Sequence, residues 1–419
     1  MTTSATAERF EPSPPAGDAS RAGAVGYPRS PAHVIRTDPE AIEIAHAVAE
    51  RLAKGAAQRD RERSLPVAEL EIYSQSGLWA LNVPKPFGGA DASWTTIAEA
   101  VAIVSAVDPS LGQLIQNHLD FVDTVRTVGT EAQQRFFFTE VLKGLRTGNA
   151  YSEFGSRTAA TFETRIERRG DEYVVSGRKF YCSGAYLAHM VPIIAVDAAG
   201  RLYIAVANRN APGLEVSNDW SSFGQRTTVS GTTTIEGVVL PAERVFALPE
   251  RPSSNGPVCQ IVHAAVDAGI ARGALQETIS FVRNFARSWI DSGQEHAWQD
   301  PLTISQIGDV AVRVRAADAL LARAGRFVDA AVADTTAETV ARASIAVAES
   351  KVLTTEAALL ATNKLFELGG TRTVLAKLNL DRHWRNARVH TLHDPVRWKY
   401  NIVGNYYLND ARPPQHAWI

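Results

Sequence analysis

The sequence predicts an α+β multidomain protein with a helical N-terminal domain, a central β domain and a C-terminal helical bundle. Its 419 residues exceed what one simple hydrophobic core usually holds, so several domains are expected. Apolar residues recur at helical spacing up to residue 146, alternate as in strands over 147–248, and return to helical spacing after residue 255. This order of patterns sets the predicted order of domains.

The first 146 residues divide into a tail and a helical domain. Residues 1–30 are rich in Ala, Ser, Pro and Gly, a composition that buries little apolar surface, so we expect a disordered tail. The N-terminal all-helical domain is predicted over 31–146. Its first helix is expected in DPEAIEIAHAVAERLAKGAAQRDRE, where the Asp-Pro start suits a cap followed by proline in the first turn. Gly77 is expected to end the next helix.

The central β domain is predicted over 147–248. Short strands separated by Gly, Asn and Asp turns are indicated in TRIERRGDEYVVSGRKFYCSG, VPIIAVDAAGRLYIAVANR, GLEVSNDW and TTTIEGVVLPAERVF. We expect a small antiparallel barrel or sandwich.

The C-terminal helical bundle and tail are predicted over 255–419. Ala-rich amphipathic spacing joined by short links favours an antiparallel four-helix bundle. The carrying segments are QIVHAAVDAGIARGALQETISFVRNFARSW, SQIGDVAVRVRAADALLARAGRFVDAAVA and TAETVARASIAVAESKVLTTEAALLATNKLFELGG. The sequence contains no P-loop and no G-x-G-x-x-G pattern.

Composition excludes several function classes. A formal net charge of −2 gives no strong field to attract nucleic acid or an anionic membrane surface. No apolar run approaches the roughly 20 residues of a spanning helix, and no secretory signal precedes the helices. Cys182 and Cys259 lack metal-ligand spacing. We therefore expect a cytoplasmic protein with no metal site and no structural disulfide.

Seven motifs, taken in order, carry a resemblance to a known family. This set resembles the acyl-CoA dehydrogenase superfamily, in the flavin-dependent monooxygenase branch that contains dibenzothiophene monooxygenase and the sulfur-acquisition oxidoreductases. The resemblance spans residues 35–412 and is strongest to the sulfur-acquisition group. The motifs are DPSLGQLIQNH, TGNAYSE, GRKFYCSGA, NDWSSFGQRTTVSG, FVRNFARSW, ELGGTR and DRHWRNARVHTLHDPV.

The resemblance implies a two-component monooxygenase. A separate NAD(P)H-dependent flavin reductase supplies reduced FMN, which reacts with dioxygen to a flavin 4a-hydroperoxide. This species then oxidises a small organosulfur compound of the sulfone or sulfinate class, for sulfur acquisition. A homotetramer is expected. Two alternatives stay open: an FAD-dependent acyl-CoA dehydrogenase, and a non-catalytic helical scaffold that has lost its flavin.

One departure counts against the dehydrogenase alternative. Many acyl-CoA dehydrogenases carry a catalytic glutamate in the region that matches VHTLHDP, where this chain has Asp394. Aspartate is one methylene shorter, about 1.5 Å less reach, and a general base must come within hydrogen-bond distance of its proton. Asp394 is therefore expected to orient or neutralise a neighbour.

The resemblance also suggests catalytic residues. His393 is predicted to hold the reactive oxygen species as an acid or base, because its imidazole titrates near neutrality. Ser183 is expected to donate to the flavin ring, and His118 to lie on the substrate side. The competing interpretations are a solvated helix end for His393 and a buried core histidine for His118.

Flavin and substrate contacts complete the prediction. Arg287, expected on a bundle helix, and Arg372 are predicted to bind the flavin phosphate, because planar guanidinium groups match phosphate oxygens. The full flavin-binding set is Asn149, Ser152, Ser183, Trp220, Arg287, Arg372 and Lys399. The substrate pocket is predicted to involve His118, Phe121, Tyr151 and Phe223. Without the resemblance, the cations would be assigned to the surface and the aromatics to the core.

Overall fold

The computed structural model describes residue 28 and residues 31–248 and 253–419. These residues form two compact units. The β unit comprises Thr147–Ser221 and Val229–Leu248, and the helical unit comprises the other described residues, including the loop Ser222–Thr228. Apart from residue 28, the tail predicted at 1–30 lies outside the described residues.

Helices fill the chain before the sheet. The first helix begins after Thr37, whose hydroxyl accepts a hydrogen bond from the amide of Glu40, so the cap lies one residue before Asp38. Gly55 has a φ of 83° and breaks the expected first helix into two, while Gly77, with a φ of 87°, follows the third helix and ends it as predicted. The elements are α1 (Asp38–Ala53), α2 (Ala56–Glu62), α3 (Val67–Gln75), η1 (Leu78–Ala80), η2 (Lys85–Phe87), α4 (Trp94–Val107), α5 (Pro109–Leu114), α6 (Gln116–Val128) and α7 (Glu131–Leu142).

The β unit contains one seven-stranded sheet with the order β5-β6-β2-β1-β3-β4-β7. β1 and β2 form a hairpin, and the chain then returns on the other side of β1, so β3 lies beside β1 in parallel. The expectation of wholly antiparallel strands was therefore wrong, and the sheet is mixed. The elements are β1 (Arg165–Arg169), β2 (Glu172–Lys179), η3 (Ala185–Leu187), β3 (Met190–Val196), β4 (Leu202–Asn208), β5 (Leu214–Val216), β6 (Thr233–Pro241), η4 (Ala242–Arg244) and β7 (Val245–Ala247).

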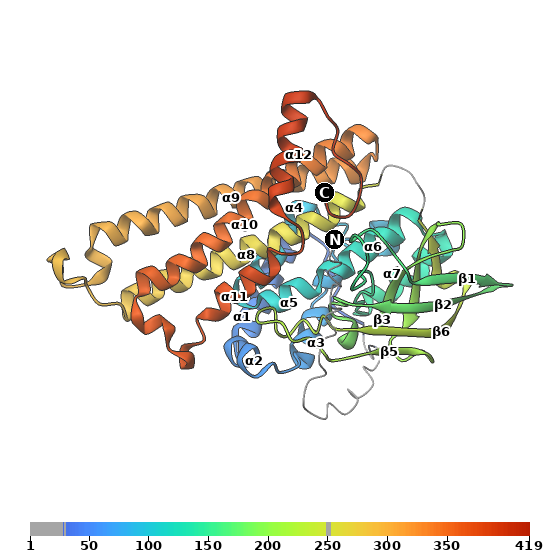
Figure 1. Cartoon of the computed structure of the whole chain (residues 1–419), viewed down its shortest axis with the longest axis horizontal. Helices are drawn as coiled ribbons and strands as arrows, with labels where there is room; N and C mark the ends of the chain where they lie inside the picture. The colour runs from blue at the N-terminus through green and yellow to red at the C-terminus, as the bar shows by residue number, and fades with distance from the viewer. Residues whose placement is uncertain (1–27, 29–30, 249–252) are drawn as a thin grey trace, which may run out of the picture. The chain divides into compact units, whose positions relative to one another are not determined.

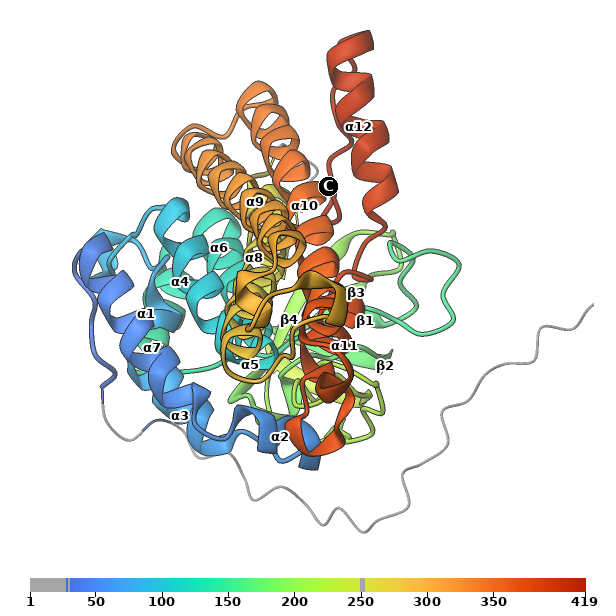
Figure 2. The ribbon, with the colours of Figure 1, turned by 90° about the vertical axis from the view of Figure 1, so that its left-hand side faces the viewer.

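Three long helices form the bundle of the helical unit: α8 (Asn255–Asn284), α9 (Pro301–Ala333) and α10 (Ala337–Gly369). They lie side by side (Figures 1 and 2), and α4 from the N-terminal part packs against α8 and α9. A Cβ at Gly269 or Gly273 would come within 2.4 Å or 2.2 Å of backbone oxygens of α4, so glycine permits this close approach. The shorter elements of this region are η5 (Ile290–Ser292), η6 (Ala297–Gln299), η7 (Thr371–Val374) and η8 (Ala376–Leu378).

Two further helices close the helical unit: α11 (Asp381–His390) and α12 (Val396–Asn409), both in contact with α10. The order of helices, sheet and long helices confirms the predicted fold class. No helix in the described part of the chain has the length and apolar character needed to cross a membrane.

Candidate active site

Three histidines meet inside the helical unit, and we call them the histidine cluster: His263 of α8, His390 at the end of α11, and His393 in the turn before α12. One ring nitrogen from each lies within 4.8 Å of the others, and His263 Nδ1 is 3.3 Å from His390 Nε2. His390 and His393 are three residues apart on one turn, which brings them to the same side. His263 joins them only through the packing of α11 on α8.

A buried ion pair stands behind His390. Asp267, one turn after His263 on α8, has Oδ1 at 2.5 Å from His390 Nδ1 and Oδ2 at 2.7 Å from Lys351 Nζ of α10. The hydroxyl of Thr355 also donates to Asp267. Burial alone would raise the pKa of Asp267, but Lys351 and His390 hold it below its usual range. Burial opposes the charge on Lys351, yet attraction by Asp267 raises the pKa of Lys351, so both groups stay charged.

His393 has defined partners on both ring nitrogens. Its Nδ1 lies 2.8 Å from the carbonyl oxygen of His390, and its Nε2 lies 2.8 Å from the side-chain amide nitrogen of buried Gln113 on α5. The surrounding protein lowers the pKa of His393, first by desolvation and then by His390. The residue as a whole is exposed, so water also solvates its ring and limits that effect. The neutral imidazole is the favoured form.

Lys399 belongs to this same region and not to an open phosphate site. It is buried, with Nζ 3.2 Å from Asp394 Oδ2 and 2.6 Å from the carbonyl oxygen of Trp418. Burial lowers the pKa of Lys399, and Asp394 opposes that effect. Its ammonium already has internal partners, and a contribution of its charge to the flavin phosphate stays a prediction. Asp394 is paired in the same contact, so it is no free base.

His118 lies in the core of the helical unit. It is fully buried, its Nε2 is 2.8 Å from the carbonyl oxygen of Trp79, and burial lowers its pKa to about 3. Phe121 is equally buried and packs edge to face against Phe137. These are the contacts of core residues, which was the competing interpretation. A substrate role for either one stays a prediction.

The other two predicted pocket residues are more open. Phe223 is 46% exposed and stacks on Trp384 at a centroid distance of 6.1 Å within the helical unit. Tyr151 is half-buried in the β unit, where its carbonyl oxygen accepts a hydrogen bond from Lys179. Their contact with a substrate also stays a prediction.

The β unit brings the motifs TGNAYSE and GRKFYCSGA together. Lys179 forms a buried ion pair with Glu153 at 2.6 Å, and the carbonyl oxygen of Ser152 accepts from the amide of Phe180. A Cβ at Gly148 would come within 2.3 Å of the nitrogen of Ala185, so glycine is required where the two segments cross. Three predicted flavin contacts, Asn149, Ser152 and Ser183, therefore lie in adjoining segments.

Two of these residues have polar atoms suited to a flavin. Asn149 Oδ1 is buried, and none of the described residues donates a hydrogen bond to it. A buried acceptor of this kind costs free energy unless a ligand supplies a donor, such as a flavin imide N–H. Ser183 Oγ pairs with Ser230 Oγ at 2.7 Å and so has a fixed direction. Trp220 contacts Tyr181 at a centroid distance of 6.1 Å and follows Asp219, which accepts from Thr232. The residues present fit FMN.

The two predicted phosphate arginines lie in neighbouring segments. Arg287 was expected on a bundle helix. α8 ends at Asn284, however, so Arg287 lies in the loop that follows the helix. Arg372, in η7 after the glycine pair, donates to the carbonyl oxygen of Phe285 in that same loop at 3.0 Å. Both arginines are exposed, which also fits the competing interpretation of surface cations, so their contact with a flavin phosphate stays a prediction.

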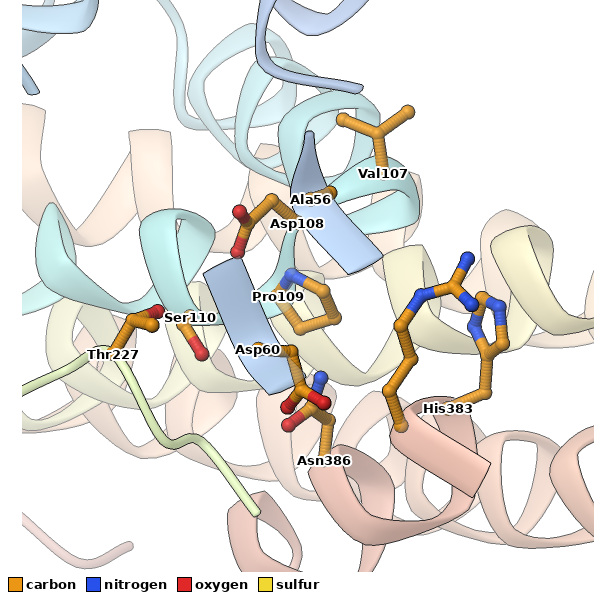
Figure 3. Close-up of a pocket in the computed structure, with 10 residues that line it drawn as sticks. Ala56, Asp60, Val107, Asp108, Pro109, Ser110, Thr227, His383 and Asn386 are labelled. Carbon is orange, nitrogen blue, oxygen red and sulfur yellow. The ribbon is translucent and has the colours of Figure 1, made fainter. Parts of the chain in front are cut away.

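A separate pocket lies between α2, the junction of α4 and α5, and α11 (Figure 3). Its side chains include Asp60, Asp108, His383 and Asn386. The pocket offers about 10 Å³, which suffices for roughly one water molecule. It is too small for a flavin or an organosulfur substrate, and none of the predicted site residues lines it.

Sequence reasoning missed the partners of His393. The missed residues are Gln113, His263, Asp267, Lys351 and His390. A usable signal existed, because His263 and Asp267 stand one helical turn apart in the apolar run VHAAVDAGIA, and Lys351 interrupts a similar run in α10. Polar groups at core positions of a helix usually need a buried partner. Which partner each one meets could not be read from the spacing.

Comparison with known proteins gives two family matches and a set of relatives. Residues 42–145 match the family described as acyl-CoA dehydrogenase, N-terminal domain, and residues 261–398 match acyl-CoA dehydrogenase, C-terminal domain. The chain is 32% identical to the dibenzothiophene monooxygenase of Rhodococcus qingshengii over 396 residues, which covers 90% of this chain and 95% of that protein.

Two further relatives have comparable coverage. The probable FMNH2-dependent monooxygenase SfnC of Pseudomonas putida is 33% identical over 392 residues, covering 90% of this chain and 98% of that protein. The structure of the methanesulfinate monooxygenase MsuC from Pseudomonas fluorescens is similar with a TM-score of 0.85 and 30% identity, covering 90% of this chain and 99% of that chain.

Proposed function

Because the chain belongs to the acyl-CoA dehydrogenase family, in its flavin-dependent monooxygenase branch, we propose that it uses reduced FMN and dioxygen to oxidise a small organosulfur compound. The observation that carries this proposal is the similarity to an FMNH2-dependent monooxygenase over 90% of the chain. The buried acceptor of Asn149 and the fixed hydroxyl of Ser183 support a flavin at the β unit.

When bound, reduced FMN would supply two electrons. One oxygen atom of dioxygen is then transferred to the organosulfur substrate, and the other is reduced to water. The side chains of the protein bind the flavin and orient it. Asn149 and Ser183 offer an acceptor and a hydroxyl to the flavin ring, and Trp220 offers an aromatic wall. Arg287 and Arg372 offer charge-assisted hydrogen bonds to the phosphate.

His393 handles the proton. Its Nδ1 donates to the carbonyl oxygen of His390, so a neutral ring carries a lone pair on Nε2, where the Gln113 amide now donates. The lowered pKa keeps the ring neutral at physiological pH. His393 therefore accepts a hydrogen bond or a proton at Nε2 and returns it as the oxidation proceeds.

Acyl-CoA dehydrogenation is not favoured by the geometry. The residue in place of the usual glutamate, Asp394, is buried and paired with Lys399. This carboxylate would have to break a buried ion pair before it reached a substrate.

The proposed substrate is a small sulfone or sulfinate. The relatives include both a methanesulfinate monooxygenase and dibenzothiophene monooxygenases, so family membership leaves the size of the substrate open. The buried packing of His118 and Phe121 favours a small ligand, because a fused aromatic would need an apolar slot where these side chains now pack.

A turnover assay tests both the proposed reaction and the proposed substrate class. The protein is incubated with a flavin reductase, FMN and NADH, and a panel of organosulfur compounds is followed by product analysis. Oxidation of methanesulfinate or a small dialkyl sulfone, with dibenzothiophene left unchanged, is expected. Efficient dibenzothiophene oxidation without small-sulfone activity would replace the substrate class. Oxidation of acyl-CoA with an artificial electron acceptor would replace the reaction itself.

The proposal extends to assembly. We propose a homotetramer that receives its flavin from a separate reductase. Exposed apolar residues in the loop beside Arg287 and on α12 support contact between subunits, among them Trp289 at 69%, Ile290 at 85% and Leu408 at 83% exposure. Light scattering coupled to size exclusion is the test, and a monomer at micromolar concentration would contradict it.

A further inference from the structure

The contacts of the histidine cluster define where its protons lie. A carboxylate only accepts hydrogen bonds, so His390 Nδ1 carries the proton that faces Asp267. In a neutral ring, His390 Nε2 then accepts, and the donor at 3.3 Å is Nδ1–H of His263. On the other arm, His393 Nδ1 donates to the carbonyl oxygen of His390, and its Nε2 accepts from Gln113. All three rings share the Nδ1–H tautomer.

This proton pattern depends on the ion pair of Lys351 and Asp267. The pair is almost fully buried, at 1% and 0% exposure of the two side chains. Buried ion pairs seldom add stability over an apolar pair of the same size, so stability alone gives little reason for this one. Because the pair lies directly behind His390, its position indicates instead a role in setting the tautomer and the protonation of the three imidazole rings.

We propose that the Lys351–Asp267 pair positions the histidine cluster for the oxidation. The carboxylate holds the rings in one tautomer, and the ammonium prevents the cluster from capturing a proton, so that His393 presents Nε2 as an acceptor. Lys351 and Asp267 act through His390 and are positioning residues. The catalytic part of this inference rests on the proposed function, whereas the tautomers do not.

Charged groups around the cluster come from α8, α10 and the start of α12. Lys351 and Lys399 oppose a proton on the rings, while Asp267 and Asp394 favour one. Lys399 and Asp394 pair with each other. The thiol of Cys259 on α8 is kept uncharged, since burial raises its pKa. With these charges balanced, Lys351 decides whether Asp267 meets an ammonium or draws a proton onto a histidine.

A metal ion is the competing occupant. The three ring nitrogens lie close enough to ligate one, and a carboxylate behind a ligating histidine is common in metal sites. The hydrogen bonds disfavour a bound metal ion, because the Nε2 atoms of His390 and His393 already accept hydrogen bonds from His263 and Gln113. An ion would have to displace both contacts.

The first test observes the wild-type protein and uses variants only to assign its signals. Histidine-selective ¹⁵N NMR of the cofactor-free protein, with the three signals assigned by single His→Gln substitutions, reports the tautomer and the protonation midpoint of each ring. We expect the proton on Nδ1 in all three rings, with His263 and His393 neutral at about pH 7.5. An Nε2–H tautomer in any of the three rings, or an imidazolium cation at His263 or His393, would overturn the proposal. So would stoichiometric zinc uptake that is lost in His263→Gln.

The second test uses variants that should act in opposite directions. Lys351→Met leaves Asp267 unpaired, so the protonation midpoint of the cluster is expected to rise by about one pH unit or more. Asp267→Asn leaves the ammonium unopposed, so the midpoint should fall. The matched control is Asp123→Asn, which changes a buried carboxylate that is paired with Arg126. Its midpoint should equal that of the wild type. Shifts of the same sign, or none, in folded variants would overturn the proposal.

Activity then connects the cluster to the reaction. In Lys351→Met, the pH below which product formed per reduced FMN declines should move up by about one unit or more, together with the protonation midpoint, and activity lost at the lower pH should recover as the pH rises. A structural defect would not recover with pH, and that result would overturn the positioning role. If the wild type oxidises no organosulfur compound but shows the expected tautomers, the proposed function fails and the proton pattern stands.

Discussion

Two buried charge networks occupy the helical unit, and they are built differently. Around the small pocket, Arg385 grips both oxygens of Asp60 at 2.6 and 3.1 Å, and Asn379 donates to the same carboxylate. The carboxylates of Asp60 and Asp108 there face guanidinium or amide groups, which do not release a proton near neutrality. Around the histidine cluster, by contrast, the carboxylate of Asp267 faces an imidazole that can.

This difference in proton exchange suggests a structural role for the Arg385 network and a chemical role for the histidine cluster. Arginine stays charged at any pH a protein meets, so the Arg385 network is a permanent clamp between α2 and α11. Histidines can take and return protons, so the cluster can take part in a reaction. The comparison predicts large effects on stability from the first network and large effects on coupling from the second.

The largest expected effect comes from Arg385→Ala. Removing the guanidinium leaves Asp60 buried and unpaired, so the free energy of unfolding should fall by about 3–5 kcal/mol. Urea unfolding measures it. The control is Arg315→Ala, whose side chain is 75% exposed and whose loss should cost at most about 1 kcal/mol. Equal losses for the two variants would remove the contrast between the networks.

Next comes His393→Ala, which should leave stability and FMN affinity nearly unchanged, because the residue is exposed and acts after the flavin binds. Product formed per reduced FMN should fall about tenfold or more, with oxygen diverted to hydrogen peroxide. The exposed His46 on α1 provides a matched His46→Ala control. Full coupling in His393→Ala would contradict the assignment.

A smaller effect is expected at the exposed arginines, which belong to neither network. Arg287→Ala and Arg372→Ala should each weaken FMN binding by about tenfold and riboflavin binding hardly at all, since only FMN carries the phosphate. Fluorescence titration with both flavins measures this, and Arg313→Ala on α9 is the control. Similar losses for the two flavins would place these arginines away from the phosphate.

The smallest effect concerns pH and His118. Its folded pKa of about 3 lies below the ordinary value of 6.5, so below about pH 6.5 the unfolded chain binds a proton that the folded chain does not. The contribution of His118 to the free energy of unfolding is therefore present above the pKa of the unfolded chain and is lost as the pH falls below that value. Between about pH 7.5 and 5.5 it should cost roughly 1 kcal/mol. His118→Gln should flatten that part of the stability profile, measured by urea unfolding, and an unchanged slope would argue against a buried neutral histidine.

Local features of the fold could be predicted because they depend on neighbouring residues. The periodicity of apolar residues located the helices and strands, and Gly77 ended its helix where the left-handed conformation was needed. Errors arose where local signals competed. Gly55 split a helix whose apolar spacing ran on past it, and α8 ended before Arg287 although the helical pattern continued.

What the sequence determined by itself is the fold class, the family and the turn that carries His393, since all of these are written in short stretches of the chain. The tertiary structure alone decided the state of that histidine. Asp267 lies 123 residues from His390, and Gln113 lies 280 residues from His393. No spacing rule connects such distant positions. They meet because α5, α8, α10 and α11 bury their apolar faces together, and that burial also removes the water that would otherwise screen the charges.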